Sequence, residues 1–317
     1  RACVVLDISI LGVPFSLPPL GNRRWLDLLP PYPWSDTRKT VVKGPMCPQL
    51  DFVRGEFVGQ EDCLYMSIYV PKACTKETPC AVMQWIYGGA WIIGGNAFLN
   101  KYDGTKLAKA HNIIIVAANY RLDVLGWLAV QELQDERDDG VYGNYGLRDQ
   151  RYALQWTRRN IENFGGDISR ITLFGESAGG FSVCQHLVSP ASNQLFSNAI
   201  IESGDCSGPW AIFDGPSAKN FGDLFSKDVG CPNNNDPRGR AACLRSLPLH
   251  KLMEPYLSWL CPVPRPNDPW CNRTIPPTSP SPSSSSSSSL LSFNNNNNNN
   301  NNNSNNSSSR SSKASKW

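Results

Sequence analysis

The stretch ITLFGESAGGFSV, residues 171–183, decides how this sequence is interpreted. A β-branched and apolar run ends at Gly175, a serine follows at Ser177, and small residues come directly after it. This order is typical of a strand that turns sharply into a helix and holds one hydroxyl at the turn. The pattern G-x-S-x-G has a steric reason, because side chains two residues before and after the serine would collide with the neighbouring strand and helix. It predicts a nucleophilic serine, although such a stretch alone also fits a plain tight turn.

A nucleophilic serine that attacks a carbonyl also needs backbone donors for the oxyanion that forms. The first candidate is the amide of Ala178, because it follows the serine at the start of the expected helix. A second source is the loop WIYGGAWIIGG, residues 85–95, in which Gly89 and Ala90 are small enough to let backbone N–H groups face a substrate. We therefore predict an oxyanion hole made by these three amides. Without the serine, the same Gly-Gly-Ala segment would be only a turn.

The rest of the chain alternates apolar runs of strand length with stretches at helical spacing. This alternation predicts an α/β fold with a largely parallel central sheet. The expected strands are residues 63–71, 81–87, 113–120, 170–175 and 198–204, and the expected helices are residues 105–111, 145–166 and 178–188.

After Glu254 the composition changes to proline, then to runs of serine and asparagine. Such a segment buries too little apolar surface to offset its ordering entropy. We expect two regions, a folded one at residues 1–254 and a low-complexity, disordered tail at residues 255–317.

The charge and hydropathy of the sequence argue against nucleic-acid binding and against a membrane-spanning helix. The net charge of the 317 residues is +3, and the tail supplies five basic residues against one acid, so the body is close to neutral. A near-neutral body lacks the basic footprint of a nucleic-acid-binding protein. No run approaches the roughly 20 apolar residues that span a bilayer, and the N-terminal ACVVLDISIL does not have the layout of a signal peptide.

The chain has eleven cysteines, and none of them forms a C-x-x-C pair of the kind found in zinc sites. Their scatter indicates a few disulfides formed in an oxidising compartment, which predicts a secreted or secretory-pathway protein. Composition alone also fits reduced, buried cysteines.

A series of motifs, taken together, resembles the type-B carboxylesterase (cholinesterase-like) family of α/β-hydrolases. The resemblance implies a serine esterase that acts on small carboxylic esters without a metal or an organic cofactor; oligomeric state is not implied. It implies only the N-terminal portion of the α/β-hydrolase fold. The carrying stretches are GVPFSLPPLGNRRW, WSDTRKTVVKGPMCPQ, EDCLYMSIYVP, WIYGGAWIIGG, NYRLDVLGWL, GNYGLRDQRYALQW, NIENFGGDISRITLFGESAGG and LFSNAIIESG, with a weaker echo in VGCPNNNDPRGRAACLRSLP.

The same resemblance assigns roles within the site. It implies that Ser177 is the acyl-enzyme nucleophile and that Gly89, Ala90 and Ala178 line the oxyanion hole. Glu176, beside the nucleophile, would tune the electrostatics of the site, or it would be a structural carboxylate.

Further features follow from the resemblance. It implies two disulfides, Cys47–Cys63 and Cys231–Cys243, and an ion pair between Arg24 and Glu61 that would otherwise be a solvated surface pair. The stretch between Cys47 and Cys63 contains no tryptophan, whereas cholinesterases use one there to hold a quaternary ammonium by a cation–π contact. We therefore expect a substrate other than a choline ester. Trp210 would border the acyl pocket or belong to the core.

The base and acid of a catalytic triad are missing from this pattern. The chain has three histidines, His111, His186 and His250, and we expect each to be a surface or helix-end residue. The family's acid and histidine both lie in its second half. Four interpretations stay open: an esterase that is truncated or misassembled, a genuine shortened protein, a non-catalytic adhesion or binding protein on the same scaffold, and a non-functional fragment.

Overall fold

A six-stranded sheet forms the centre of the computed structural model, which describes residues 7–51, 56–96, 98, 101–134, 142–207, 214–232 and 237–260. The strand order is β1-β4-β6-β5-β7-β8. Strand β4 runs antiparallel to both β1 and β6, and β6, β5, β7 and β8 are parallel. The strands are β1 (Ile8–Pro14), β4 (Tyr65–Val70), β5 (Cys80–Ile86), β6 (Ile114–Ala118), β7 (Gly166–Glu176) and β8 (Asn198–Glu202); β2 (Gln49–Asp51) and β3 (Glu56–Val58) form a separate hairpin.

All five strands expected from the sequence are present in the sheet, so the α/β architecture is confirmed. The sequence did not indicate β1, which lies at one end of the strand order and pairs with β4. Its register shifts between Ile10 and Val13, where Gly12 has a φ of 70°. A bulge at a glycine breaks the period-two pattern by which strands are found.

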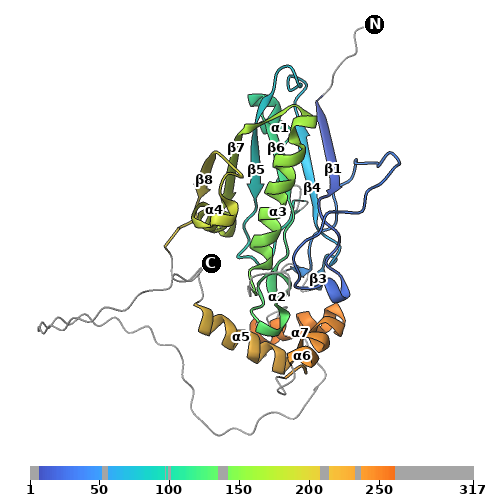
Figure 1. The fold of residues 1–317 in the computed structure, drawn as a ribbon, viewed down its shortest axis with the longest axis vertical. Helices are drawn as coiled ribbons and strands as arrows, with labels where there is room; N and C mark the ends of the chain where they lie inside the picture. The colour runs from blue at the N-terminus through green and yellow to red at the C-terminus, as the bar shows by residue number, and fades with distance from the viewer. Residues whose placement is uncertain are drawn as a thin grey trace, which may run out of the picture.

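Helices cover both faces of the sheet (Figure 1). The buried side chains alternate along β4, because Met66 and Ile68 pack with the core on the α3 side, whereas Tyr69 packs against Ala108 of α1. Helix α4 adds Val183 to the same core as α3. The helices here are α1 (Thr105–His111), α3 (Tyr145–Asn160) and α4 (Ala178–Val188), with a short 3₁₀ turn (Ile161–Phe164) closing the expected 145–166 segment.

A second apolar cluster lies beyond the end of the sheet at which β5 and β7 finish (Figure 1). Leu125 of α2 (Asp123–Trp127) packs there with Phe225, Leu244 and Leu252, which come from three successive helices. These are α5 (Gly215–Asp228), α6 (Pro237–Ser246) and α7 (Leu249–Leu260). Helix α7 continues past the boundary expected at Glu254, into the first residues of the tail expected at 255–317. The part of that expected tail from residue 261 onward lies outside the described residues.

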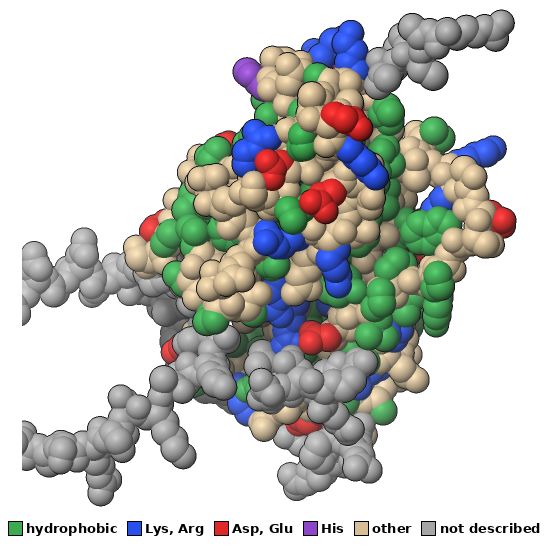
Figure 2. All heavy atoms as spheres, turned by 45° about the horizontal axis from the view of Figure 1, so that its top comes forward, with side chains coloured by type: hydrophobic (Ala, Val, Ile, Leu, Met, Phe, Trp, Pro, Cys, Tyr) green, Lys and Arg blue, Asp and Glu red, His purple; other side chains and the backbone are tan. Residues whose placement is uncertain are grey.

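The surface of the described part carries mixed charge. Figure 2 shows Lys and Arg side chains interspersed with Asp and Glu over the visible face. Within the described residues, no helix combines the length and the apolarity that a membrane crossing requires.

Candidate active site

Ser177 lies at the junction of β7 and α4 in a strained backbone conformation. Its φ is 53° and its ψ is −123°, a combination that L-residues rarely adopt. Strain of this kind persists only where the surroundings fix the chain. Here the Ser177 amide donates to the carbonyl oxygen of Glu202 at 2.9 Å, and the Ser177 carbonyl accepts from the amide of Phe181 at 2.9 Å.

The two glycines of the motif have the steric role that the sequence indicates. A Cβ atom on Gly179 would lie 2.0 Å from the carbonyl oxygen of Ile86 in β5. On Gly175 it would lie 2.6 Å from the backbone of Gly179. The tight crossing of strand and helix therefore excludes any larger residue at either position and pushes the serine out of the turn.

The glycine-rich loop after β5 lies directly against the serine. A Cβ atom on Gly88 would lie 3.0 Å from Cβ of Ser177 and 2.9 Å from Oε2 of Glu176. The loop then takes left-handed conformations in succession, with φ of 113° at Gly89, 53° at Ala90 and 60° at Trp91. The structure thus brings together the loop and the serine that the sequence had paired.

Free backbone donors are available at this place. Among the hydrogen bonds of the described residues, the amides of Gly89, Ala90 and Ala178 have no acceptor. The Ser177 hydroxyl likewise has no hydrogen-bond partner in that part of the chain. Unpaired amides beside an unpaired hydroxyl, at the start of a helix, are suited to a negatively charged oxygen.

Side chains distant in sequence hold the loop in this shape. Gln49 exchanges two hydrogen bonds with Gly94, since its Nε2 donates to the Gly94 carbonyl at 2.7 Å and its Oε1 accepts from the Gly94 amide at 2.8 Å. Asn119 accepts from the Asn96 amide at 2.8 Å and donates to the Cys63 carbonyl at 2.9 Å. Both side chains are buried. Sequence reasoning missed them, because nothing local marks an amide as a loop anchor.

A buried polar chain connects the same loop to α4 and α3. Trp91 Nε1 donates to Ser182 Oγ at 3.0 Å, and Gln150 Nε2 donates to the same oxygen at 3.2 Å. Gln150 Oε1 then accepts from His186 Nε2 at 3.1 Å, which leaves His186 Nδ1 to accept from Ser192 at 2.8 Å. With this assignment, both ring nitrogens of a neutral imidazole have partners.

The structure decides between the two alternatives expected for His186, which is a helix-end residue but not a surface residue. It lies in the last turn of α4 and is buried, with only 2% of its surface exposed. Burial lowers the pKa of His186 to about 3, and the positive charge of Arg151 acts in the same direction. Both ring nitrogens have partners, so this imidazole is not available to Ser177.

The other two histidines do not supply a base either. His111 ends α1 and precedes β6, which puts it at the opposite edge of the parallel strands from Ser177. His250 lies in α7. None of the three histidines, all of which the structure describes, hydrogen bonds to the serine.

Glu176 is half-buried at the end of β7, beside the nucleophile. Burial raises the pKa of Tyr102, and the negative charge of Glu176 raises it further. The carboxylate is therefore electrostatically coupled to Tyr102, and its role in tuning the site stays a prediction. Trp210 lies outside the described residues.

Four disulfides are present in the part of the chain that the structure describes. The structure joins Cys47 to Cys63 and Cys231 to Cys243, the two pairs that the resemblance implied. It also joins Cys74 to Cys80 and Cys184 to Cys206, which sequence reasoning missed. The short spacing of Cys74 and Cys80 around a polar turn is a signal that could have indicated the former; the latter pair had no such signal.

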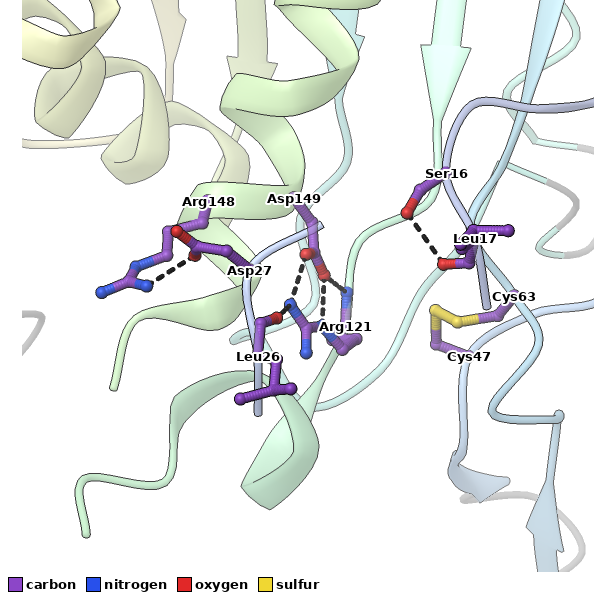
Figure 3. A network of polar contacts seen from close by, with 9 residues as sticks. All are labelled: Ser16, Leu17, Leu26, Asp27, Cys47, Cys63, Arg121, Arg148 and Asp149. Atoms are coloured by element: carbon purple, nitrogen blue, oxygen red, sulfur yellow. Dashed lines mark hydrogen bonds and ion pairs between the residues drawn. A yellow bond between two sulfur atoms is a disulfide. The ribbon is translucent and has the colours of Figure 1, made fainter. Parts of the chain in front are cut away.

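Ion pairs fix the N-terminal segment to the body of the fold. Arg24 binds Glu61 with two contacts of 2.5 Å, and both side chains are largely buried, so this is not a solvated surface pair. A second pair, Arg121–Asp149, joins the segment after β6 to α3 through bonds of 2.8 and 2.7 Å and is fully buried (Figure 3). Arg148 of α3 reaches Asp27 at 2.6 Å in the same network.

Comparisons with known proteins give the family. A family model described as "Carboxylesterase family" matches residues 8–310. The acetylcholinesterase of Gallus gallus is 42% identical over 249 residues, which cover 75% of this chain and 31% of that protein. The cholinesterase of Mus musculus is 39% identical over 249 residues, covering 75% and 40%. The acetylcholinesterase 1 of Caenorhabditis elegans is 42% identical over 212 residues, covering 63% and 33%.

The chain thus spans between 31% and 40% of the length of these relatives. An elbow serine between two sterically required glycines, a facing loop with free amides and the family match over most of the chain all agree. The chain belongs to the carboxylesterase family.

Proposed function

We propose that Ser177 is the nucleophile of a carboxylic ester hydrolase that works through an acyl-enzyme. The observation that carries this proposal is the strained elbow itself. Gly88 of the donor loop packs against Ser177, and three amides there have no acceptor among the described residues. Backbone strain of this kind is maintained where function requires it. A scaffold that only binds a partner has no need to hold a serine in this conformation.

The chemistry follows from these groups. The Ser177 oxygen forms a bond to the ester carbonyl carbon while its proton passes to a base, and the carbonyl electron pair moves onto oxygen. The amides of Gly89, Ala90 and Ala178 hold that oxyanion. The alcohol then leaves with a proton, and water releases the acid by the same steps in reverse order.

The base that accepts the serine proton is not among the described histidines. The chain spans less than half of each relative described above, so we propose that this segment supplies the nucleophile and the oxyanion donors. Alone, it would retain only the modest catalysis that binding and oxyanion stabilisation provide.

The segment between Cys47 and Cys63 bears on which esters the protein accepts. The relatives named above are cholinesterases, but residues 47–63 contain no tryptophan to hold a quaternary ammonium. We propose a neutral ester rather than a choline ester. An uncharged ester would then protect Ser177 from covalent labelling, whereas the quaternary-ammonium ester with the same acyl group would protect it less; equal or better protection by the cation would contradict this.

The four disulfides of the described residues are evidence that the protein folds in an oxidising compartment. Such bonds persist in secreted proteins and are rare in the cytosol. We propose that the protein passes through the secretory pathway.

The second candidate is a non-catalytic binding protein on the same scaffold. The observation in its favour is that no histidine in the described part of the chain reaches Ser177. A fluorophosphonate probe separates the two. We expect it to label the wild-type chain and a Ser207→Ala control at one site, and not to label Ser177→Ala. Absence of labelling in the wild type would favour the binding protein.

A further inference from the structure

A short strap crosses the first turns of α4 immediately behind the nucleophile. It consists of residues 202–206, which begin at the last residue of β8. Its first residue, Glu202, pairs with Glu176 in the parallel register and accepts the hydrogen bond from the Ser177 amide at 2.9 Å. The backbone of the serine is thus tied to the strap by a direct bond.

The middle of the strap touches the helix without any side chain between them. A Cβ atom on Gly204 would lie 2.7 Å from the carbonyl carbon of Gly180 and 2.9 Å from the amide nitrogen of Phe181. Conversely, a Cβ atom on Gly180 would lie 2.8 Å from the Glu202 carbonyl oxygen. Backbone is therefore packed on backbone, and a small displacement of the strap would be transmitted to the turn that carries Ser177.

The far end of the strap is joined covalently to the same helix. Cys206 forms a disulfide with Cys184, which is buried on α4, and the loop that this bond closes spans 22 residues and contains all of β8. Within the described sheet, β8 is an edge strand that pairs only with β7, and most of its side chains are exposed. The disulfide therefore ties the far end of the strap covalently to α4.

We propose that the Cys184–Cys206 disulfide is a positioning element for Ser177: it clamps the strap against α4, and the strap in turn holds the serine backbone in its strained conformation. This inference rests on the proposed role of Ser177 for its chemical consequence, and on the contacts alone for its structural one. The disulfide acts on Ser177 only through the strap, and neither cysteine contacts substrate or the reacting atoms.

The test replaces both cysteines together, in Cys184→Ser/Cys206→Ser, so that no free thiol remains. The matched control is Cys74→Ser/Cys80→Ser, which removes a disulfide at the other end of the same sheet, where Cys80 pairs with Gly166 at the start of β7. A further variant, Gly204→Ala, keeps the disulfide but pushes the strap away from Gly180; its control is Gly215→Ala, where a Cβ meets nothing within 4 Å. If the double cysteine variant does not fold, the same measurements are made on Gly204→Ala.

Two readouts are measured: hydrogen exchange of the amides of residues 175–181, and the rate of fluorophosphonate labelling of Ser177. In Cys184→Ser/Cys206→Ser we expect the elbow amides to exchange faster than in the control variant, while the amides of β5 exchange at the same rate. We also expect Ser177 to be labelled more slowly by a factor of about ten or more, since misplacement of a reacting group by 1 Å can reduce a rate a hundredfold. In the control variant Cys74→Ser/Cys80→Ser, we expect the elbow exchange rate and the Ser177 labelling rate to equal those of the wild type.

Other outcomes decide against the proposal. Unchanged exchange in the elbow would overturn it, as would a uniform acceleration across β5 and the elbow, which indicates global loss of stability. Faster elbow exchange with an unchanged labelling rate would show that the clamp does not set the reactivity. If wild-type Ser177 is never labelled but elbow exchange still depends on the disulfide, the proposed esterase function fails and the positioning role stands.

Discussion

Gly179 and Ile86 are in such close contact that a single methyl group between them cannot be accommodated. A Cβ atom at position 179 would lie 2.0 Å from the Ile86 carbonyl oxygen, which belongs to the central strand β5. Because backbone of the sheet centre cannot move away as a flexible side chain could, we expect Gly179→Ala to destabilise the protein by about 3 kcal/mol, the top of the usual overpacking range. Thermal and urea unfolding measure this.

Gly215→Ala is the matched control for that substitution. Gly215 begins α5, and a Cβ atom there meets no atom within 4 Å. Alanine also has the higher helix propensity, so the change is expected to be neutral or slightly stabilising. Equal midpoints for the two variants would contradict the steric account of the elbow.

The Arg24–Glu61 pair makes a second prediction. Arg24 donates to both carboxylate oxygens of Glu61 and also to the Leu247 carbonyl after α6, so it joins the N-terminal segment to the helical cluster. Removing one member of a buried pair leaves the other charge uncompensated, and we expect Arg24→Ala to cost about 3 to 5 kcal/mol.

Substitution by lysine tests the geometry of that pair. Arg24→Lys keeps the charge but loses the planar fork, and we expect an intermediate loss. The control is Arg170→Ala, whose pair with Asp167 is half exposed; exposed pairs contribute at most about 1 kcal/mol. Urea unfolding that gives the same loss for Arg24→Ala and Arg170→Ala would refute the structural role of the former.

His186 predicts an acid dependence of stability. Its pKa is about 3 in the folded protein against 6.5 for an ordinary histidine, because burial disfavours the cation. Between these values only the unfolded chain binds the proton, so stability is complete above pH 6.5 and is lost as the pH falls, by about 1.4 kcal/mol per pH unit. We expect His186→Gln to lose this slope in urea titrations between pH 4.5 and 7.5. An exposed His111→Gln control keeps it, and a slope unchanged in His186→Gln would count against the buried, neutral imidazole.

For Asp123 we expect stability to change with pH in the opposite direction. Burial raises its pKa to about 7, from 3.8, although the Val124 amide donates to it. The folded chain therefore holds a proton that the unfolded chain has released between these values, and stability falls as the pH rises through that range. Asp123→Asn removes the penalty, and asparagine tolerates the φ of 51° at this position.

The variant is accordingly expected to gain stability over the wild type at pH 8 and to gain little at pH 4. Asp36→Asn, at an exposed position, serves as the control with no pH-dependent gain. A gain for Asp123→Asn that is the same at both pH values would show that the carboxyl of Asp123 is not held protonated by burial.

The elements that could be predicted from sequence are those with local signals. Apolar runs marked β5 and β6, and the glycines around Ser177 marked the elbow, because a steric requirement in a turn leaves a pattern of adjacent residues. The donor loop could be paired with the serine for the same reason.

The remaining features depend on contacts between distant segments. Gln49 anchors Gly94, and His186 is buried because Gln150 and Ser192 meet its two nitrogens. A polar residue near the end of a helix gives no sign that such partners exist, so the expectation of a surface or helix-end residue did not include the burial of His186. The Cys184–Cys206 bond was missed likewise, because among eleven cysteines the pairing is fixed by the fold.

The most direct test of the account is the mass of the protein after brief reaction with an activated neutral ester and an acid quench. We predict the addition of one acyl group, located in fragmentation spectra on Ser177 and absent in Ser177→Ala. An unmodified wild-type chain, or an acyl group that Ser177→Ala carries to the same extent, would contradict the claim that Ser177 is an acyl-enzyme nucleophile.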